Sequence, residues 1–106
     1  MFKKEFRLPK NVKFDKKYQA YSNFFAVKIA ENSTGLKRFG VVVSKNIDKR
    51  AVGRNRIKRQ IRRCIEENEK NLSSGKDILV IARPGIRDKE TKEISEELKR
   101  IFAKIK

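Results

Sequence analysis

The segment from Lys45 to Arg63 constrains the fold most, because it joins a dense positive charge to a helical apolar stripe. Nine of its nineteen residues are Lys or Arg and one is acidic, so it carries +8 of the chain's net charge of +16. Apolar residues follow Ile57 at intervals of four, seven and eight residues, namely Ile61, Cys64 and Ile65. A disordered basic tail has no such stripe, so we expect this charge to lie on a packed helix.

At 106 residues the chain is expected to form one domain, residues 1–106, that buries roughly 65% of the surface of its unfolded form. Charged residues make up 40% of the sequence, but Phe, Ile and Val recur in ordered patterns, which indicates a folded protein with a strongly solvated surface. A pI near 10.3 favours a polyanion as partner, since Lys and Arg release condensed counterions when they bind phosphates. No apolar run exceeds five residues, so we expect a cytoplasmic protein without a transmembrane helix or signal peptide.

The first half of the chain is predicted to contain one helix and a β-hairpin. Aromatic residues at helical spacing, Phe14, Tyr18 and Tyr21, predict a helix of about ten residues that begins at Asn11. After it, β-branched and aromatic residues predict two strands joined by a turn that contains Gly35. The parts of this antiparallel hairpin are a strand at 24–30, a turn at 31–36 and a strand at 37–44.

The second half of the chain is predicted to contain two helices that flank one strand. The basic helix is expected to run from about Arg54 to Lys70, with Gly53 just before its start. The apolar run at 77–82 is typical of a strand buried on both faces, and Asp88 is expected to cap a final helix. The apolar side of that helix consists of Ile94, Leu98, Ile101, Phe102 and Ile105. This order of elements predicts an α+β fold in which helices pack on a small mixed β-sheet.

The charges of the basic helix are arranged against the stability of the helix itself. Arg54, Arg56 and Lys58 crowd its predicted N-terminus, whereas three Glu residues within 66–69 crowd its C-terminus. The helix dipole favours the opposite order by roughly 0.3–1 kcal/mol for each charge. A bound phosphate reverses this sign, because backbone N–H groups and guanidinium forks favour an anion at the N-terminus. We therefore expect the helix to bind a polyanion, with a solvated surface helix or a membrane-surface helix as the alternatives.

Residues suited to catalysis or metal binding are missing from the sequence. It contains no His for acid–base chemistry and no spacing typical of a zinc site. Two groups of Glu, within 66–69 and 90–97, are expected to diverge on exposed helix faces and not to share a metal ion. Cys64 is the single cysteine, and its place on the apolar stripe predicts a small core residue. We therefore expect no catalytic residue and no metal ligand in the protein.

Two runs of sequence carry the most specific motif in the chain. The first is Phe39–Lys45 (FGVVVSK), and the second is Ala51–Arg63 (AVGRNRIKRQIRR), which contains Arg-Asn-Arg. Together they resemble the protein subunit of bacterial ribonuclease P, for which Arg-Asn-Arg is a signature. Further matches extend over nearly the whole chain, at Arg7, Leu8, Phe14, Tyr18 and the run 78–83. The resemblance implies an α+β fold in which a left-handed β-α-β crossover carries the basic helix, contrary to the usual right-handed rule.

The resemblance also implies a function and its partners. Proteins of this family assist a catalytic RNA that removes the 5′ leader from precursor tRNA, so the assembly is an endoribonuclease whose Mg²⁺ is bound mainly by the RNA. The expected partners are therefore the ribonuclease P RNA and precursor tRNA, and neither DNA nor a membrane. The implied contacts with the RNA subunit are Lys45, Lys49, Arg50, Arg54, Asn55, Arg56, Lys58, Arg59, Arg62 and Arg63. The implied contacts with the leader are Phe14, Tyr18, Phe25 and Val27.

Two other functions stay open alongside this one. A ribosomal or general RNA-binding protein could use the same basic helix, and the RNA that co-purifies with the protein would separate the two. A stand-alone protein nuclease would cut RNA unaided, which the missing acid–base residues disfavour.

Overall fold

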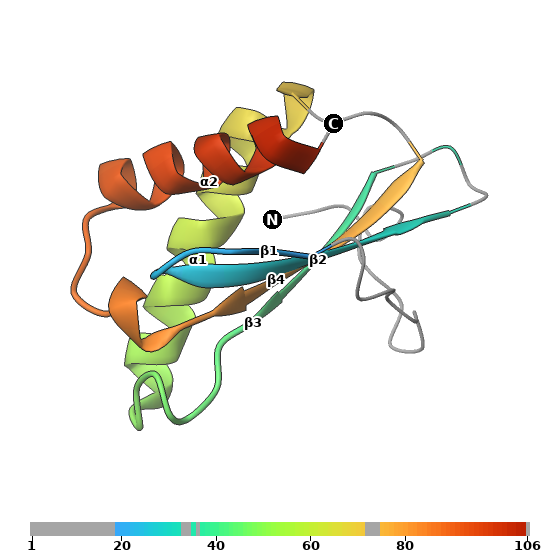
Figure 1. Ribbon diagram of the computed structural model, residues 1–106. Coiled ribbons are helices and arrows are strands. Elements are labelled where there is room, and N and C mark those ends of the chain that lie inside the picture. Colours follow the sequence, from blue (N-terminus) through green and yellow to red (C-terminus); the bar gives the residue numbers. More distant parts are fainter. Residues whose placement is uncertain (1–18, 33–34, 36, 72–74, 106) are drawn as a thin grey trace.

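Two helices pack on one face of a four-stranded sheet (Figure 1). The structure is a computed structural model, and it describes residues 19–32, 35, 37–71 and 75–105. Its elements in chain order are β1 (Gln19–Tyr21), β2 (Phe25–Glu31), β3 (Arg38–Val42), α1 (Ala51–Asn68), a 3₁₀ turn (Glu69–Asn71), β4 (Lys76–Ala82), a second 3₁₀ turn (Pro84–Ile86) and α2 (Thr91–Ile105). The predicted α+β class, with helices on a small mixed sheet, is confirmed.

The strand order in the sheet is β1-β2-β4-β3. Strand β2 is antiparallel to both of its neighbours, β1 and β4, whereas β3 runs parallel to β4. The predicted hairpin of β2 and β3 is therefore wrong, because β4 lies between these two strands. The most apolar run of the chain takes a central position, where Val80 pairs with Val27 on one side and with Val41 on the other. Burial of this run outweighs the local preference for a short turn.

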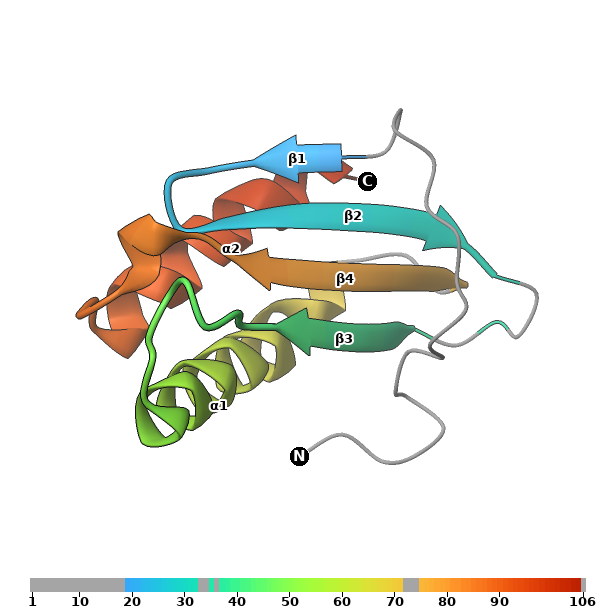
Figure 2. The same ribbon diagram turned by 90° about the horizontal axis from the view of Figure 1, so that it is seen from below.

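The connection from β3 through α1 to β4 is left-handed, as the resemblance implies. In Figure 2 the two parallel strands point the same way, and the helices lie behind the sheet. With the strands turned to point upward, β4 lies to the right of β3 while α1 passes behind them. A right-handed crossover would place the helix in front of the sheet.

The core lies between the sheet and the two helices. Alternate residues of β2 and β4 face the helices, and the predicted apolar stripe of α1 packs onto them. The strands contribute Phe25, Val27, Ile29, Ile78, Val80 and Ala82, and α1 contributes Ile57, Ile61, Cys64 and Ile65. Helix α2 adds Ile94, Leu98, Ile101 and Phe102. Neither helix is long and apolar enough to cross a membrane within the described ranges.

Several predicted boundaries are corrected by the structure. Tyr21, expected on a helix, lies in β1, and the rest of that predicted helix falls outside the described residues. Helix α1 begins at Ala51, so Gly53 lies inside its first turn. Asp88 does not cap α2, because it has a positive φ of 64° in the turn before the helix. The backbone N–H of Glu90 instead donates to the carboxylate of Glu93 at 3.0 Å, one half of a capping box.

Strand β4 is also less buried than its sequence predicts. The side chains that face the helices are fully covered, but Leu79 and Ile81, on the other face, are only half-buried. A continuous apolar run therefore covers one face of the sheet completely and the opposite face in part.

Candidate nucleic-acid interface

Helix α1 is fixed through its apolar stripe, and this places its cations on the outside of the molecule. The side chains of Asn55, Arg56, Arg59 and Arg63 are exposed, and those of Arg54, Lys58 and Arg62 are half-buried. The remaining predicted RNA contacts, Lys45, Lys49 and Arg50, are exposed in the loop that leads into the helix. We call these ten residues the basic face. All ten residues for which the resemblance implies contact with the RNA subunit thus lie on α1 or in the loop before it.

Few acids neutralise the basic face. Its ion pairs in the described part of the chain include Arg50 with Asp48 at 3.1 Å and Arg63 with Glu67 at 3.4 Å, and Glu66 lies beside Arg59, Arg62 and Arg63. The first turn of α1 contains no acidic residue and the last turn no basic one, so the predicted conflict with the helix dipole is present. The charge of the surface is therefore available to an external anion.

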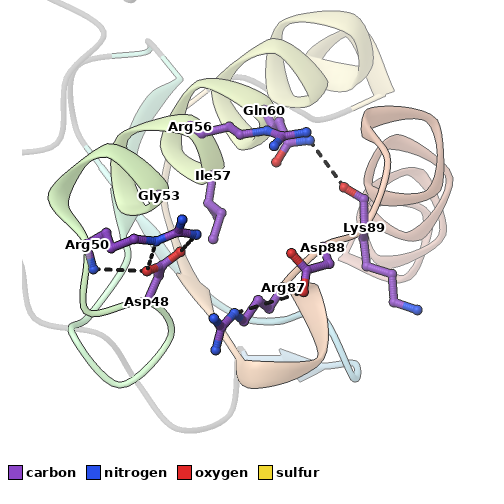
Figure 3. Close-up of a pocket in the computed structure, with 9 residues that line it drawn as sticks. All are labelled: Asp48, Arg50, Gly53, Arg56, Ile57, Gln60, Arg87, Asp88 and Lys89. Carbon is purple, nitrogen blue, oxygen red and sulfur yellow. Dashed lines mark hydrogen bonds and ion pairs between the residues drawn. The ribbon is translucent and has the colours of Figure 1, made fainter.

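A tight turn before α1 organises the start of the basic face (Figure 3). The Asp48 carboxylate is only 6% exposed and accepts hydrogen bonds from the backbone N–H of Arg50 at 2.9 Å and from its Nε and Nη2 at 3.2 and 3.1 Å. These hydrogen bonds lower the pKa of Asp48 to about 2. Arg54 reaches back from the first turn of the helix, and its Nη1 donates to the carbonyls of Asp48 and Lys49 at 3.0 and 2.9 Å.

A shallow pocket of about 40 Å³ lies between the first half of α1 and the turn before α2. Arg56 and Arg87 line it from these two segments, and Gln60 bridges them by donating to the Lys89 carbonyl at 3.2 Å (Figure 3). The Lys89 ammonium points away, over the ring of Phe24 at 5.7 Å. Arg87 is a cation beside the basic face that sequence reasoning missed, because the last forty-three residues carry a net charge of only +1.

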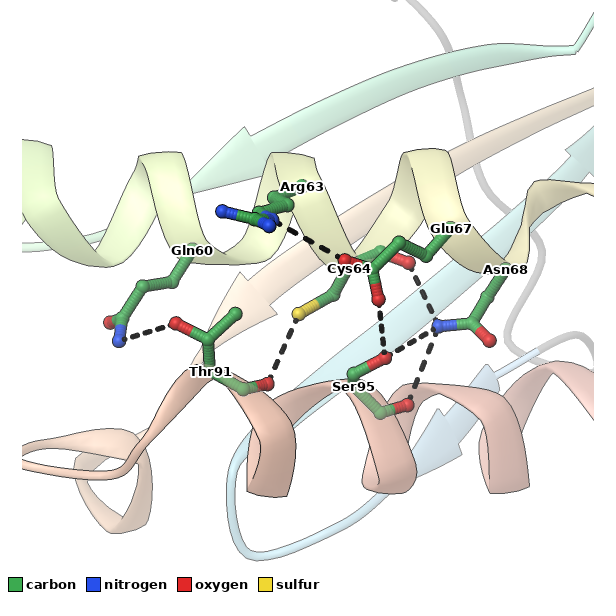
Figure 4. Close-up of polar contacts among 7 residues, drawn as sticks. All are labelled: Gln60, Arg63, Cys64, Glu67, Asn68, Thr91 and Ser95. Atoms are coloured by element: carbon green, nitrogen blue, oxygen red, sulfur yellow. Dashed lines mark hydrogen bonds and ion pairs between the residues drawn. The ribbon is translucent and has the colours of Figure 1, made fainter.

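Polar contacts join the second half of α1 to the first half of α2 (Figure 4). Asn68 Nδ2 donates to the Cys64 carbonyl at 2.8 Å and to Ser95 Oγ at 3.1 Å, and Ser95 Oγ donates to Glu67 at 3.3 Å. The Cys64 thiol points at the Thr91 carbonyl, and burial raises its pKa to about 11. Cys64 is therefore the unreactive core residue that its place on the stripe predicts.

The predicted leader contacts on β2 require a correction. Phe25 and Val27 have 0% of their surface exposed, because both point into the core under the helices. A ligand cannot reach them in this fold. The face turned away from the helices instead carries Lys28 and, opposite Ala26 on β1, the ring of Tyr21, which is 61% exposed. Phe14 and Tyr18 lie outside the described residues.

Among the described residues, no three Asp, Glu or Cys side chains lie close enough together to hold a metal ion. Of the carboxylates that the structure describes, the two most buried are already bound by arginines: Asp48 by Arg50, and Asp77 by Arg38, whose Nε and Nη2 donate to it at 2.7 Å each. These carboxylates do not fit a Mg²⁺ site of the protein's own, since Mg²⁺ requires oxygen ligands free to coordinate it.

Comparison with known proteins gives matches over nearly the whole chain. The family model described as Ribonuclease P matches residues 2–106. The ribonuclease P protein component of Geobacillus kaustophilus is 35% identical over 107 residues, covering 96% of this chain and 88% of that protein. The Clostridium botulinum component is 36% identical over 106 residues, covering 95% of each chain.

Solved structures resemble the fold closely. The RNase P protein of Staphylococcus aureus matches with a TM-score of 0.80 and 33% identity, covering 94% of this chain and 96% of that one. The RNase P protein of Thermotoga maritima matches with a TM-score of 0.75 and 25% identity, covering 83% of each chain.

Proposed function

The chain belongs to the ribonuclease P protein family and is thus the protein component of an RNA–protein ribonuclease, and from this premise we propose that its basic face binds the catalytic RNA. One observation carries this proposal. The cations of α1 gather on its outer side with few acids near them, in an order that the helix dipole disfavours. Phosphates of an RNA backbone would offset that unfavourable order and release counterions.

The second part of the proposal concerns the substrate. The 5′ leader of precursor tRNA is single-stranded, and unpaired bases stack on aromatic rings for about 1–3 kcal/mol each. We assign the leader to Phe14 and Tyr18 and to the sheet face turned away from the helices. The exposed Tyr21 ring and the half-buried Lys28 of that face support this assignment, and they replace the buried Phe25 and Val27.

Hydrolysis of the phosphodiester is assigned to the RNA, with Mg²⁺ that the RNA holds. The protein has no His, and the two most buried carboxylates among the described residues are bound to arginines, which leaves them unsuited to act as a general base. Its own part is to bind the catalytic RNA and orient the substrate through the leader.

Reconstitution tests the proposal. Cleavage of a precursor tRNA by the cognate RNA is measured at low Mg²⁺ without protein, with the protein, and with the double variant Arg59→Ala/Arg62→Ala. We expect the protein to stimulate cleavage and the double variant to stimulate it less. The matched control is Lys99→Ala/Arg100→Ala, which removes two exposed cations from α2 and should behave as wild type.

Three outcomes would contradict the proposal. The absence of any stimulation would remove the assigned role. Ribosomal RNA as the main co-purifying species would favour a general RNA-binding protein. Cleavage by the protein alone would identify a protein nuclease.

A further inference from the structure

Asp48 is the one acidic residue of the segment 45–63, and it is buried where its neighbours are exposed cations. Its carboxylate accepts three hydrogen bonds from Arg50, whose own side chain is 73% exposed. An acid here weakens the attraction of the surface for a polyanion. Its burial and its hydrogen bonds indicate that it does something other than set the net charge.

The helix is built to receive this carboxylate. Gly53 lies in the first turn of α1, and a Cβ at that position would overlap Asp48 Oδ2. Arg54 binds the same turn through the backbone carbonyls of Asp48 and Lys49, which accept its Nη1. Asp48, Arg50 and Gly53, which Figure 3 shows, therefore form one closed unit with Arg54. We call this unit the Asp48 turn.

We propose that Asp48 is a positioning residue of the RNA-binding surface, which holds Arg50 and Arg54 at the start of α1. The chemical class of the ligand, an RNA backbone, rests on the proposed function. Without the carboxylate, the long and exposed Arg50 side chain loses its anchor, and the turn that Arg54 grips loses the bond to the Arg50 backbone. Cations that are held in place lose less conformational freedom when they bind phosphates.

The direction in which one substitution changes the affinity for RNA separates a positioning role of Asp48 from an effect of its charge. Asp48→Asn keeps the size of the side chain but removes its negative charge, so the net charge of the protein rises by one. If Asp48 acts only through its charge, Asp48→Asn tightens binding to RNA. If Asp48 positions the arginines, the same substitution weakens binding.

The experiment measures the affinity of the full chain for ribonuclease P RNA over a series of salt concentrations. We expect Asp48→Asn to bind roughly tenfold more weakly, with a salt slope that falls by about 0.7–0.9 for each phosphate that the arginines no longer bind. The matched control is Asp88→Asn, which removes an exposed acid beside the same pocket at a left-handed position that Asn tolerates well. This control should bind as tightly as wild type or slightly more tightly. Binding of Asp48→Asn at wild-type strength or above would overturn the proposal.

A second variant covers the case in which Asp48→Asn folds poorly, which circular dichroism reveals. Gly53→Ala leaves every charge in place but displaces the carboxylate, so we expect it to weaken RNA binding as well. The double variant Asp48→Ala/Gly53→Ala is compared with its two single variants, Asp48→Ala and Gly53→Ala. It should bind no more weakly than the weaker-binding of these two, because both substitutions act on one unit. Wild-type affinity for Gly53→Ala would overturn the proposal.

The two proposals fail separately. If the wild-type chain does not bind ribonuclease P RNA, the proposed function fails. The same comparison is then made on poly(U), where weaker binding of Asp48→Asn still supports positioning and tighter binding overturns it.

Discussion

Gly53 lies at a position of α1 where the neighbouring carboxylate decides which residue fits. In an ordinary helix interior, Ala is more stable than Gly by about 1 kcal/mol. Here the Cβ of an Ala would overlap Asp48 Oδ2, so we expect Gly53→Ala to lower the urea midpoint of unfolding. In an Asp48→Ala background the same substitution should raise the midpoint, because the obstacle is gone. A raised midpoint in the native background would contradict the tight fit.

The same carboxylate predicts how stability depends on pH. Hydrogen bonds from Arg50 lower the pKa of Asp48 from 3.8 to about 2 in the folded state. The lowered pKa means that Asp48 contributes stability above about pH 4, and that this contribution is lost as the pH falls through about 2. Urea midpoints of wild type and Asp48→Asn should therefore differ most near neutral pH and converge in acid. A difference that stays constant down to about pH 2 would argue against this assignment.

At the scale of elements, Asn68 joins α1 to α2. Its side chain is buried, and its amide group donates both within α1 and across to Ser95. We expect Asn68→Ala to lower the free energy of unfolding by about 1–3 kcal/mol, since buried partners are left unsatisfied. Asn55→Ala, at an exposed position of the same helix, is the matched control and should change stability by less than about 0.5 kcal/mol. Helix propensity cannot cause such a loss, because Ala is a better helix former than Asn. Equal changes in urea unfolding for the two variants would therefore argue against a stabilising link from Asn68 to α2.

Helix α1 could be predicted from sequence because its signal is local, whereas strand pairing is decided by residues far apart. The guanidinium of Arg38 on β3 binds Asp77 on β4 across 39 positions of sequence, and no local pattern reveals this pair. Tyr21 of β1 continues a helical spacing of aromatic residues, so a local pattern predicts a helix where the structure has a strand. The left-handed crossover could be predicted only from the family resemblance, because no sequence pattern distinguishes it from the usual right-handed connection.

The residues of the candidate site also divide into those that could be predicted from the sequence and those that could not. Residues of the basic face could be predicted because a dense charge has to lie at the surface. The burial of Phe25 and Val27 could not, because alternation along β2 shows which residues share a face but not which face the helices cover.

The whole molecule offers two separate surfaces, the basic face and the sheet face turned away from the helices. If the second of these and Phe14 hold the leader, Phe14→Ala should weaken binding of the holoenzyme to precursor tRNA by about 1–3 kcal/mol more than to mature tRNA. Equilibrium binding to both tRNAs measures the difference. Phe25→Leu is the control, because a buried ring should affect stability and leave the ratio unchanged. Equal losses for both tRNAs would make Phe14 a core residue only.

The distribution of charge over the molecule, and not its total, should govern RNA binding. Arg56→Ala and Arg100→Ala each reduce the net charge of +16 by one, but Arg56 is on the basic face and Arg100 is on α2 beside Glu97. Through total charge alone, the two variants would weaken binding equally. We expect only Arg56→Ala to weaken it, with a fall of about 0.7–0.9 in the slope of log affinity against log salt concentration. Titration of both variants with ribonuclease P RNA from low to high salt distinguishes the cases, and parallel losses would mean that the RNA is held by a diffuse field with no defined docking face.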